Sequence, residues 1–340
     1  MRGILSELGD MLTYRRPMGS DTETAFVDRW IKPLPGAYVD VYGNWHVTIG
    51  NNHAKILWSC HTDTVHTLDG RQTIAFNART GLATLSKQSI REGSNCLGAD
   101  CTVGVWIMVN MIRRGVEGHY VFHYGEERGG RGSSDIAAHC APWLATFEYA
   151  IAFDRRGYRS IIVEQAGYPT ASELFALSLE EELKRSKMAY ESDRWGFFTD
   201  TANYGPHISE CTNLSVGYQH EHTTHEQLDV NHAERLLDAV CVVDQSALIS
   251  DRIPAVDTYG WGSWAGESIG SPYVFDEETD EHDTDEAGTC ELCGRYSMSV
   301  DRSGTCFLCR HATNQPQYLD PVYEEVQREL TQLFKQRQGK

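Results

Sequence analysis

Short apolar segments alternate with helical segments through the first 250 residues of the chain. Four segments have the length and composition of buried strands: residues 55–60, 119–124, 149–153 and 213–218. Three segments have the length of helices: residues 102–114, 171–190 and 230–249. Residues 73–86 fit a hairpin that turns at Arg79-Thr80-Gly81. This alternation predicts α/β layers around a mostly parallel sheet.

Acidic residues outnumber basic ones, which gives the chain a formal net charge of -18. Such a chain repels phosphate backbones and anionic lipid surfaces, so nucleic-acid binding by the main domain and membrane association are not expected. The sequence contains no long apolar run, and the residues up to Pro17 do not have the pattern of a signal peptide. We therefore expect an intracellular, cytoplasmic protein.

Composition changes sharply after residue 250. Residues 259–271 are rich in Gly and Ser, and residues 276–286 (DEETDEHDTDE) contain eight acids. A like-charge block of this density favours a flexible chain. We therefore expect a main domain over residues 1–250, an acidic flexible linker over residues 251–288, and a small module over residues 289–340.

The small module has four cysteines in the pattern C-x2-C-x12-C-x2-C: Cys290, Cys293, Cys306 and Cys309. Four thiolates in two pairs are typical of a structural zinc site, and a redox pair or free thiols are the alternatives. So short a segment has little core, and the metal would supply its folding energy. An amphipathic helix after Asp320-Pro321 packs on this zinc ribbon or on a partner. The target of the ribbon, nucleic acid included, stays open.

Acids and histidines stand where the predicted strands end. His61 and Asp63 follow residues 55–60, Glu126 and Glu127 follow residues 119–124, and Asp154 follows residues 149–153. A histidine-rich segment, residues 220–226, follows the last strand, and Asp100 precedes the first buried helix. Ligands of such sheets bind beyond the carboxyl ends of the strands. Carboxylate and imidazole side chains there suit Zn²⁺, Mn²⁺ or Co²⁺.

These segments, taken in order, resemble the co-catalytic zinc exopeptidases. The resemblance rests on His61-Thr62-Asp63, Gly98-Ala99-Asp100, residues 125–133 (GEERGGRGS), Phe153-Asp154 and residues 222–226 (HTTHE), and it spans roughly residues 5–245. It implies a three-layer α/β domain and a metal-dependent peptide or amide hydrolase, most directly an aminopeptidase-like exopeptidase. A deacylase or carboxypeptidase acting on a small amide is the alternative enzyme. An inactive hydrolase fold that binds partners through its zinc ribbon is the alternative of another class.

The resemblance also implies a role for each matching residue. The implied ligands of two catalytic zinc ions are His61, Asp100, Glu127, Asp154 and His222. Asp100 would bridge the two ions, and Glu126 would act as the general base on the water between them. Asp63 would orient the imidazole of His61. His225, and less directly His220, are the alternatives to His222.

Some positions depart from the family pattern or are left without a role. Many relatives have a second acid after the bridging Asp, whereas this chain has Cys101, which we expect to be a small buried residue and not a nucleophile. Thr199-Asp200, ahead of Tyr204, resembles a substrate-pocket segment, with an ordinary loop or helix cap as the alternative. The stretch from Asp154 to His222 is too short for an inserted lid. Homo-oligomerisation is open, and these histidines have no predicted role: His46, His53, His66, His119, His123, His139 and His207.

Overall fold

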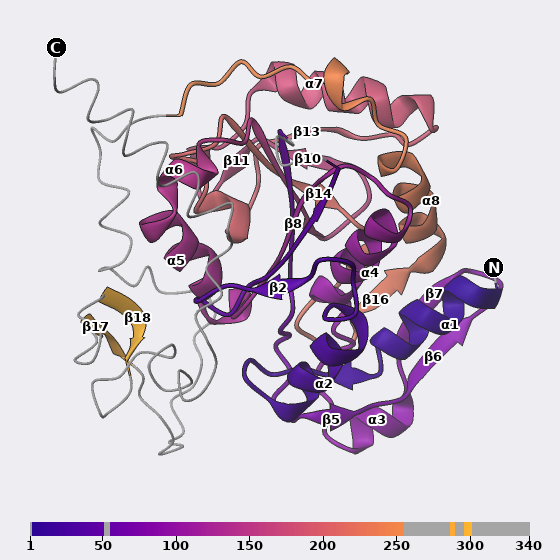
Figure 1. Cartoon of the computed structure of the whole chain (residues 1–340). Coiled ribbons are helices and arrows are strands. Elements are labelled where there is room, and N and C mark those ends of the chain that lie inside the picture. The colour runs from indigo at the N-terminus through magenta and orange to yellow at the C-terminus, as the bar shows by residue number, and fades with distance from the viewer. Residues whose placement is uncertain (1, 51–54, 255–285, 290–295, 301–340) are drawn as a thin grey trace, which may run out of the picture. The chain divides into compact units, whose positions relative to one another are not determined.

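The computed structural model describes residues 2–50, 55–254, 286–289 and 296–300, and the chain divides into two units between Pro254 and Ala255 (Figure 1). The first unit extends beyond the predicted boundary at residue 250 because Arg252 is bound to it. The guanidinium of Arg252 donates hydrogen bonds to the carbonyl oxygens of Gly205, Ile208 and Ser209 at 2.6–2.7 Å.

Eight strands form the central sheet of the first unit, in the order β13, β10, β14, β9, β4, β8, β3 and β2. Their bounds are β2 Tyr38–Val39, β3 Trp45–Ile49, β4 Ile56–His61, β8 Gly118–His123, β9 Tyr149–Arg155, β10 Ser160–Ile162, β13 Glu191–Asp193 and β14 Glu210–Ser215. The four middle strands, β14, β9, β4 and β8, run parallel to one another. At the sides, β10 pairs antiparallel with β14, β3 with β8, and β2 with β3. The prediction of a mostly parallel sheet holds for this centre, whereas the sheet as a whole is mixed.

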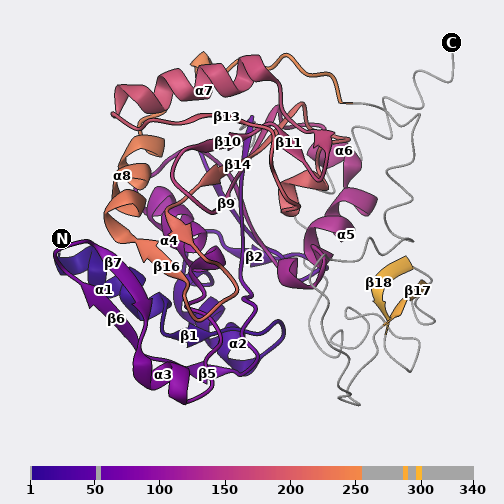
Figure 2. The same ribbon diagram turned by 180° about the vertical axis from the view of Figure 1, so that it is seen from behind.

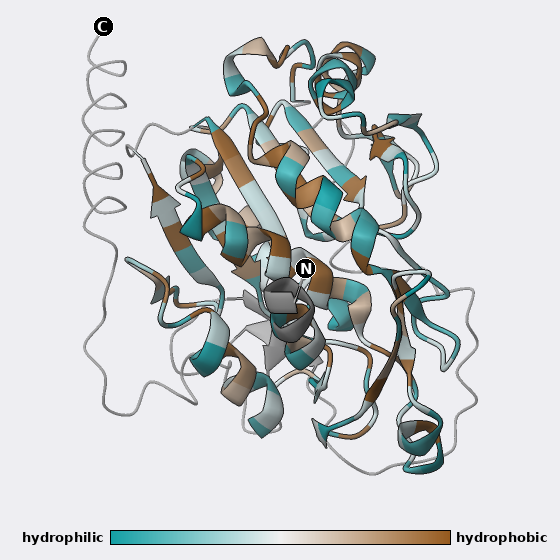
Figure 3. Cartoon of the chain, turned by 90° about the vertical axis from the view of Figure 1, so that its right-hand side faces the viewer, coloured by the Kyte–Doolittle hydropathy of each residue, from teal (hydrophilic) through white to brown (hydrophobic). Residues whose placement is uncertain are grey.

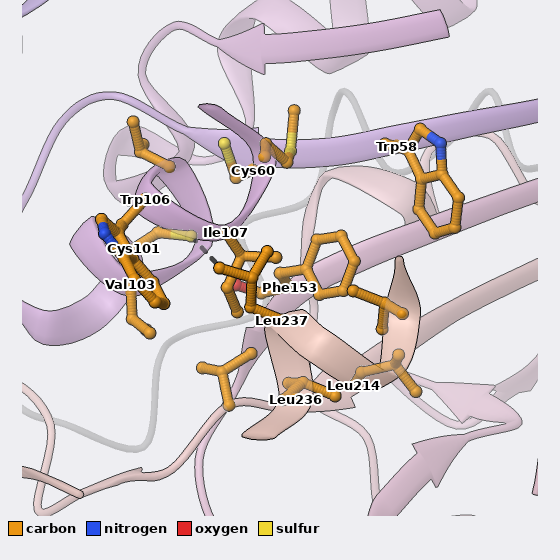
Figure 4. Close-up of a cluster of buried hydrophobic side chains, with 14 of the residues drawn as sticks. Trp58, Cys60, Cys101, Val103, Trp106, Ile107, Phe153, Leu214, Leu236 and Leu237 are labelled. Carbon is orange, nitrogen blue, oxygen red and sulfur yellow. Dashed lines mark hydrogen bonds between the residues drawn. The ribbon is translucent and has the colours of Figure 1, made fainter. Parts of the chain in front are cut away.

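Helices cover both faces of the sheet, because successive side chains of a strand point to opposite faces. Ile56, Trp58 and Cys60 of β4 belong to one apolar cluster, and Leu57 belongs to another. The larger cluster takes in α4 (Ala99–Arg113) and α8 (Val230–Val240), and Figure 4 shows part of it. The smaller cluster takes in α5 (Arg131–His139) and α6 (Ala141–Leu144), on the opposite side in Figures 1 and 2.

The lengths of the helices follow local signals at their ends. Helix α7 (Glu173–Arg185) is shorter than the predicted 171–190 and is followed by Lys187 at a φ of 60°. Helix α8 begins where Asp229 accepts a hydrogen bond from the backbone N–H of His232, and it ends at Val240. The prediction of one helix through residue 249 is wrong, because Asp244 caps a separate turn, η3 (Gln245–Ala247).

A second, four-stranded sheet carries the histidine-rich segment. Its order is β15 (Tyr218–Gln219), β16 (Gln227–Asp229), β7 (Leu82–Leu85) and β6 (Ile74–Asn77), all antiparallel. Strands β6 and β7 are the predicted hairpin, and the left-handed φ of 78° at Gly81 makes its turn. Residues 220–226 connect β15 to β16, so this sheet fixes both ends of the segment that contains His222.

The remaining elements are short or lie at the edges of the first unit. They are α1 Arg2–Met11, β1 Tyr14–Arg15, α2 Asp21–Trp30, β5 Gly70–Arg71, α3 Lys87–Arg91, η1 Glu126–Arg128, β11 Glu164–Gln165, β12 Tyr168–Pro169 and η2 Asp200–Ala202. Helices α1 and α2 lie at the N-terminal end of the first unit, and the side chain of Ser20 caps α2 by accepting the backbone N–H of Glu23. Apolar residues recur along the central strands in Figure 3. Among the described residues, none of the helices has the length and apolar character that crossing a membrane requires.

In the second unit the structure describes one antiparallel pair, β17 (Glu286–Thr289) and β18 (Tyr296–Val300). Strand β17 includes residues 286–288, the end of the predicted linker. The four cysteines of the predicted zinc ribbon and the helix after Asp320-Pro321 lie outside the described residues, as do residues 255–285. The ribbon therefore stays a prediction.

Candidate metal centre

The side chains predicted at strand ends and at the helix start come from the parallel centre of the sheet, its loops and α4. His61 is the last residue of β4, and Asp154 lies inside β9 rather than after it. Glu126 and Glu127 form η1, directly after β8, and Asp100 lies at the start of α4. His222 joins them from the loop between β15 and β16. The central sheet and the loop of the second sheet thus bring together residues that are up to 161 positions apart (222 minus 61) in the sequence.

Asp100 lies between the two histidines. Its Oδ1 is 3.1 Å from Nε2 of His61, and its Oδ2 is 3.3 Å from Nε2 of His222. Nε2 of His61 also lies 3.4 Å from Oδ1 of Asp154, and Nε2 of His222 lies 3.3 Å from Oε1 of Glu127. The result is two neighbouring groups of donors with Asp100 common to both.

The structure distinguishes among the candidate histidines of the 220–226 segment. His222 contacts two carboxylates of the cluster, and Asp100, Glu127 and His222 form one of the groups that could hold a metal ion. His220 and His225 are exposed and belong to none of the metal-holding groups found among the described residues. The geometry therefore favours His222 over both alternatives.

Asp63 connects two parts of the cluster and is completely buried. Its Oδ1 lies 3.3 Å from Nδ1 of His61, on the side of the imidazole away from Asp100. The same carboxylate accepts the backbone N–H groups of Glu126 at 3.1 Å and of Glu127 at 3.3 Å. Asp63 therefore holds the imidazole and the η1 turn together, and the side-chain pattern of the sequence gives no sign of the second contact.

Glu226 is a residue whose role the sequence analysis missed. It is buried, and its carboxylate accepts the backbone N–H groups of Gly98 and Ala99 at 2.8 Å and of Asp100 at 3.2 Å. Asp100 itself has non-helical dihedral angles, and its peptide bond to Cys101 is cis. The signal for Glu226 was present as the acid four residues after His222, but a side-chain pattern does not show which backbone groups an acid accepts.

The segment predicted as a possible pocket segment contacts the cluster through its threonine. Oγ1 of Thr199 donates a hydrogen bond to Oδ2 of Asp154 at 2.8 Å. Asp200 is buried, and neither of its carboxylate oxygens has a hydrogen-bond partner of normal geometry in the described part of the chain. Burial raises the pKa of Asp200 to about 8, and the nearby His61 and the Ser133 hydroxyl only partly offset that effect.

Burial also sets the charges of the cluster. It raises the pKa of Glu127 to about 7 and of Asp154 to about 6, and the pKa of Glu126 rises well above its ordinary value for the same reason. Burial opposes ionisation of Asp100 as well, but hydrogen bonds from His222 and His61 outweigh it and hold the pKa of Asp100 well below its usual range. The cluster thus has more carboxylates than the two histidines can neutralise, which favours the binding of an added cation.

Two buried oxygens show that the cluster fits a metal ion. Oε1 of Glu127 and Oδ1 of Asp154 accept no hydrogen bond of normal geometry among the described residues, because the nearest nitrogens, Nε2 of His222 and Nε2 of His61, also face Asp100. A buried carboxylate oxygen without a partner is costly, and a cation satisfies it. Oxygen and imidazole donors in two groups that share Asp100 match the preferences of Zn²⁺ and similar divalent ions.

Cys101 is the buried small residue that was expected. Its side chain is 0% exposed, and its Sγ donates a hydrogen bond to the carbonyl oxygen of Phe153 at 3.3 Å (Figure 4). Burial raises the pKa of the Cys101 thiol well above its usual value, which does not suit a nucleophile. The thiol packs against Gly104, where a Cβ would lie only 2.5 Å from Sγ.

No family model and no curated protein matches the sequence, but solved structures match the fold. The aminopeptidase PepT from Bacillus cereus aligns with a TM-score of 0.58 at 12% identity, over 72% of this chain and 98% of that one. A tripeptidase from Staphylococcus aureus gives the same four values. The TET1 peptidase from Pyrococcus horikoshii aligns with a TM-score of 0.52 at 16% identity, over 71% of this chain and 99% of that one. The chain therefore has the mixed α/β fold that these peptidases share.

Proposed function

We propose that the chain is a metal-dependent peptide or amide hydrolase, and most specifically an aminopeptidase-like exopeptidase with two zinc ions. The observation that carries the proposal is the arrangement of Asp100 between His61 and His222, beside one carboxylate oxygen each of Glu127 and Asp154 that accepts no hydrogen bond of normal geometry. The named peptidases with the same fold support this assignment. Mn²⁺ or Co²⁺ could take the place of zinc with the same ligands.

The proposed ligands would hold one ion between His61 and Asp154 and the other between Glu127 and His222, with Asp100 shared. Two such ions would polarise the carbonyl of a bound amide and lower the pKa of a water molecule between them. Asp63 keeps the His61 imidazole in the orientation that leaves Nε2 for the metal, because it contacts the opposite nitrogen.

Glu126 is the proposed general base. Its Oε2 lies 3.9 Å from Nε2 of His61, which is close to the cluster but longer than the contacts of the proposed ligands. Burial raises the pKa of Glu126 well above its ordinary value, which makes its carboxylate a stronger proton acceptor. Glu126 would take the proton of the attacking water and hand it to the leaving amine.

We also propose a structural zinc at Cys290, Cys293, Cys306 and Cys309, from the sequence pattern alone. Homo-oligomerisation is a further proposal. The TET1 peptidase with the same fold is described as assembling into a tetrahedron or a large octahedral shell.

The metal content of the full chain tests the proposal. Protein purified without a His tag or chelator should contain about three zinc ions per chain, and the Asp100→Ala variant should contain about one. About one zinc ion in both proteins, with none regained on adding Zn²⁺, Mn²⁺ or Co²⁺, would contradict the catalytic centre. Dipeptides with blocked amino or carboxyl termini then separate the aminopeptidase from a deacylase or carboxypeptidase, because only an aminopeptidase needs the free amino group.

A further inference from the structure

The loop between β13 and η2, residues 194–198, exposes three aromatic side chains in four residues. We name this segment the aromatic loop. The side chain of Trp195 is 84% exposed, that of Phe197 is 67% exposed and that of Phe198 is 40% exposed. Such a concentration of exposed aromatic surface is unusual for a monomeric soluble protein and marks a site that binds something apolar.

Three contacts attach the aromatic loop to the candidate metal centre. Thr199 follows Phe198 directly and donates its hydrogen bond to Asp154. Nη2 of Arg155, the residue after Asp154, donates to the carbonyl oxygen of Trp195 at 2.8 Å. The ring of Phe198 lies over Gly130, where a Cβ atom would stand 2.6 Å from Cζ, and Gly130 ends the loop that begins with Glu126 and Glu127. The position of the loop therefore depends on the same residues that build the centre.

The aromatic loop also lies on the side where the centre is open to solvent. His222 is the exposed member of the cluster, with 47% of its side chain accessible against 12% or less for Asp100, Glu127 and Asp154. Glu221, next to His222, forms an ion pair of 3.0 Å with Arg156. The guanidinium of Arg156 lies 5.8 Å from the centre of the Phe197 ring. A molecule that reaches the centre past His222 thus passes close to Phe197.

Cation–π contacts alone do not account for the loop. The ring of Phe197 accepts Arg155 and Arg156 at 5.7 and 5.8 Å, and these contacts hold the loop in place. Phe198 and Trp195 have no such partner among the described residues, yet they stay exposed beside a polar, buried cluster. An apolar group that arrives with the substrate would cover them and gain the free energy of burial.

We propose that the aromatic loop is the specificity subsite of the enzyme, with Phe197 and Phe198 binding a large apolar or aromatic side chain on the N-terminal residue of the substrate. The inference rests on the proposed function and deepens it, because it names the substrate class. The chain would prefer N-terminal Leu or Phe over Ala and Gly.

Amides of single amino acids test the subsite, because they carry only one side chain. Wild type should hydrolyse L-leucine and L-phenylalanine p-nitroanilides with kcat/KM at least about tenfold above that for the glycine compound. Phe198→Ala and Phe197→Ala should each remove most of this preference, because they should lower kcat/KM for the leucine and phenylalanine compounds far more than for the glycine compound. Phe76→Ala is the matched control, since Phe76 is also 40% exposed and lies on strand β6 of the other sheet.

A binding measurement separates failure of the subsite from failure of the hydrolase. Phenylalanine hydroxamate and glycine hydroxamate are titrated into the zinc-loaded chain by calorimetry. Tighter binding of the phenylalanine compound by about tenfold, lost in Phe198→Ala, supports the subsite even where no amide is hydrolysed. Equal affinity for the two hydroxamates, or equal kcat/KM values for the glycine and phenylalanine amides, overturns it. Self-association of the wild type that Phe198→Ala abolishes, without any substrate preference, would instead assign the loop to contacts between copies.

Discussion

Two buried clusters of histidine and carboxylate in the first unit differ in how completely their polar atoms are paired. In one, Asp40, His46, His119 and Thr48 form a continuous chain of hydrogen bonds of 2.9–3.0 Å. In the other, the candidate metal centre, one carboxylate oxygen each of Glu127 and Asp154 accepts no hydrogen bond of normal geometry from the described residues. Residue types alone do not separate the two clusters. Complete hydrogen bonding of buried polar atoms is typical of a structural network, and missing hydrogen-bond partners are typical of a ligand-binding site.

The paired cluster also satisfies its acid with backbone groups. Asp40 accepts the N–H groups of Tyr42 and Asn44 at 2.8 Å and the side-chain amide of Asn44 at 2.9 Å, in addition to His46. It therefore fixes the turn between β2 and β3. The comparison leads to opposite expectations: substitutions in the paired cluster should affect stability, and substitutions in the metal centre should affect metal binding and turnover.

Glu126→Gln gives the largest expected effect. The amide keeps the size of the side chain but cannot accept a proton, so kcat should fall about 10²- to 10⁴-fold. Metal content and the urea midpoint of unfolding should match the wild type. Steady-state kinetics with an L-leucine amide measures the change in kcat. A kcat within about threefold of wild type, which is roughly the error of such a comparison, would show that Glu126 is not the base.

Asp40→Ala should instead destabilise the fold by about 3 kcal/mol, because it leaves several buried donors without an acceptor. Turnover per folded molecule should not change, since Asp40 contacts none of the proposed ligands. Urea unfolding at pH 7 gives the free energy, and kinetics at low urea gives the activity. A variant that is stable but inactive would place the paired cluster among the functional residues and remove the distinction.

Asp63→Asn tests the boundary between the two types of cluster, because Asp63 is fully paired yet belongs to the centre. The substitution weakens the contact to Nδ1 of His61 and one of the backbone contacts to η1. Affinity for zinc should fall about 10- to 100-fold. Competition with a chromophoric chelator measures it, with Asp69→Asn, on an exposed loop, as the control. An unchanged zinc affinity would mean that Asp63 is only structural.

His119 predicts the smallest effect, a change of stability with pH. Burial, and to a lesser extent His46, lowers the pKa of His119 well below 6.5, whereas the unfolded chain titrates near 6.5. Below pH 6.5 the unfolded state therefore binds a proton that the folded state does not. The stability contribution of the neutral His119 imidazole is fully present above pH 6.5 and falls by roughly 1 kcal/mol by pH 5.5. Urea unfolding should show a smaller difference in the free energy of unfolding between pH 7.5 and pH 5.5 for His119→Gln than for wild type. Equal differences in the two proteins would contradict the lowered pKa of His119.

The convergence of the candidate site residues was easier to predict than the edges of the sheet. His61 and Asp154 were expected to lie close together because parallel strands have their carboxyl ends on the same side of the sheet. Strand β10 has three residues and β2 has two, too few for a periodic pattern to show their direction. The end of α8 was missed because Leu236 and Val240 continue an apolar pattern up to the point where Asp244 caps a new turn.

The hydrogen bonds from backbone groups to acids of the centre could not be predicted from the pattern of side chains. Glu226 and Asp63 are acids at recognisable positions, but their hydrogen-bond donors are the backbone N–H groups of Gly98 and Glu126, and every residue except proline carries such a group. Only the folded chain shows which of those groups an acid reaches. The same limit applies to the aromatic loop, whose relation to Gly130 and Asp154 depends on three separate segments.

The placement of Glu226 has a consequence for how the centre fills. The loop that carries His222, one of the proposed ligands, also carries Glu226, which binds the backbone N–H groups around Asp100, the proposed shared ligand. Opening of that loop would withdraw a ligand of one ion and release the shared ligand of both in a single movement. The two ions would then be taken up cooperatively, so that at limiting zinc the population would consist mainly of fully loaded and empty chains.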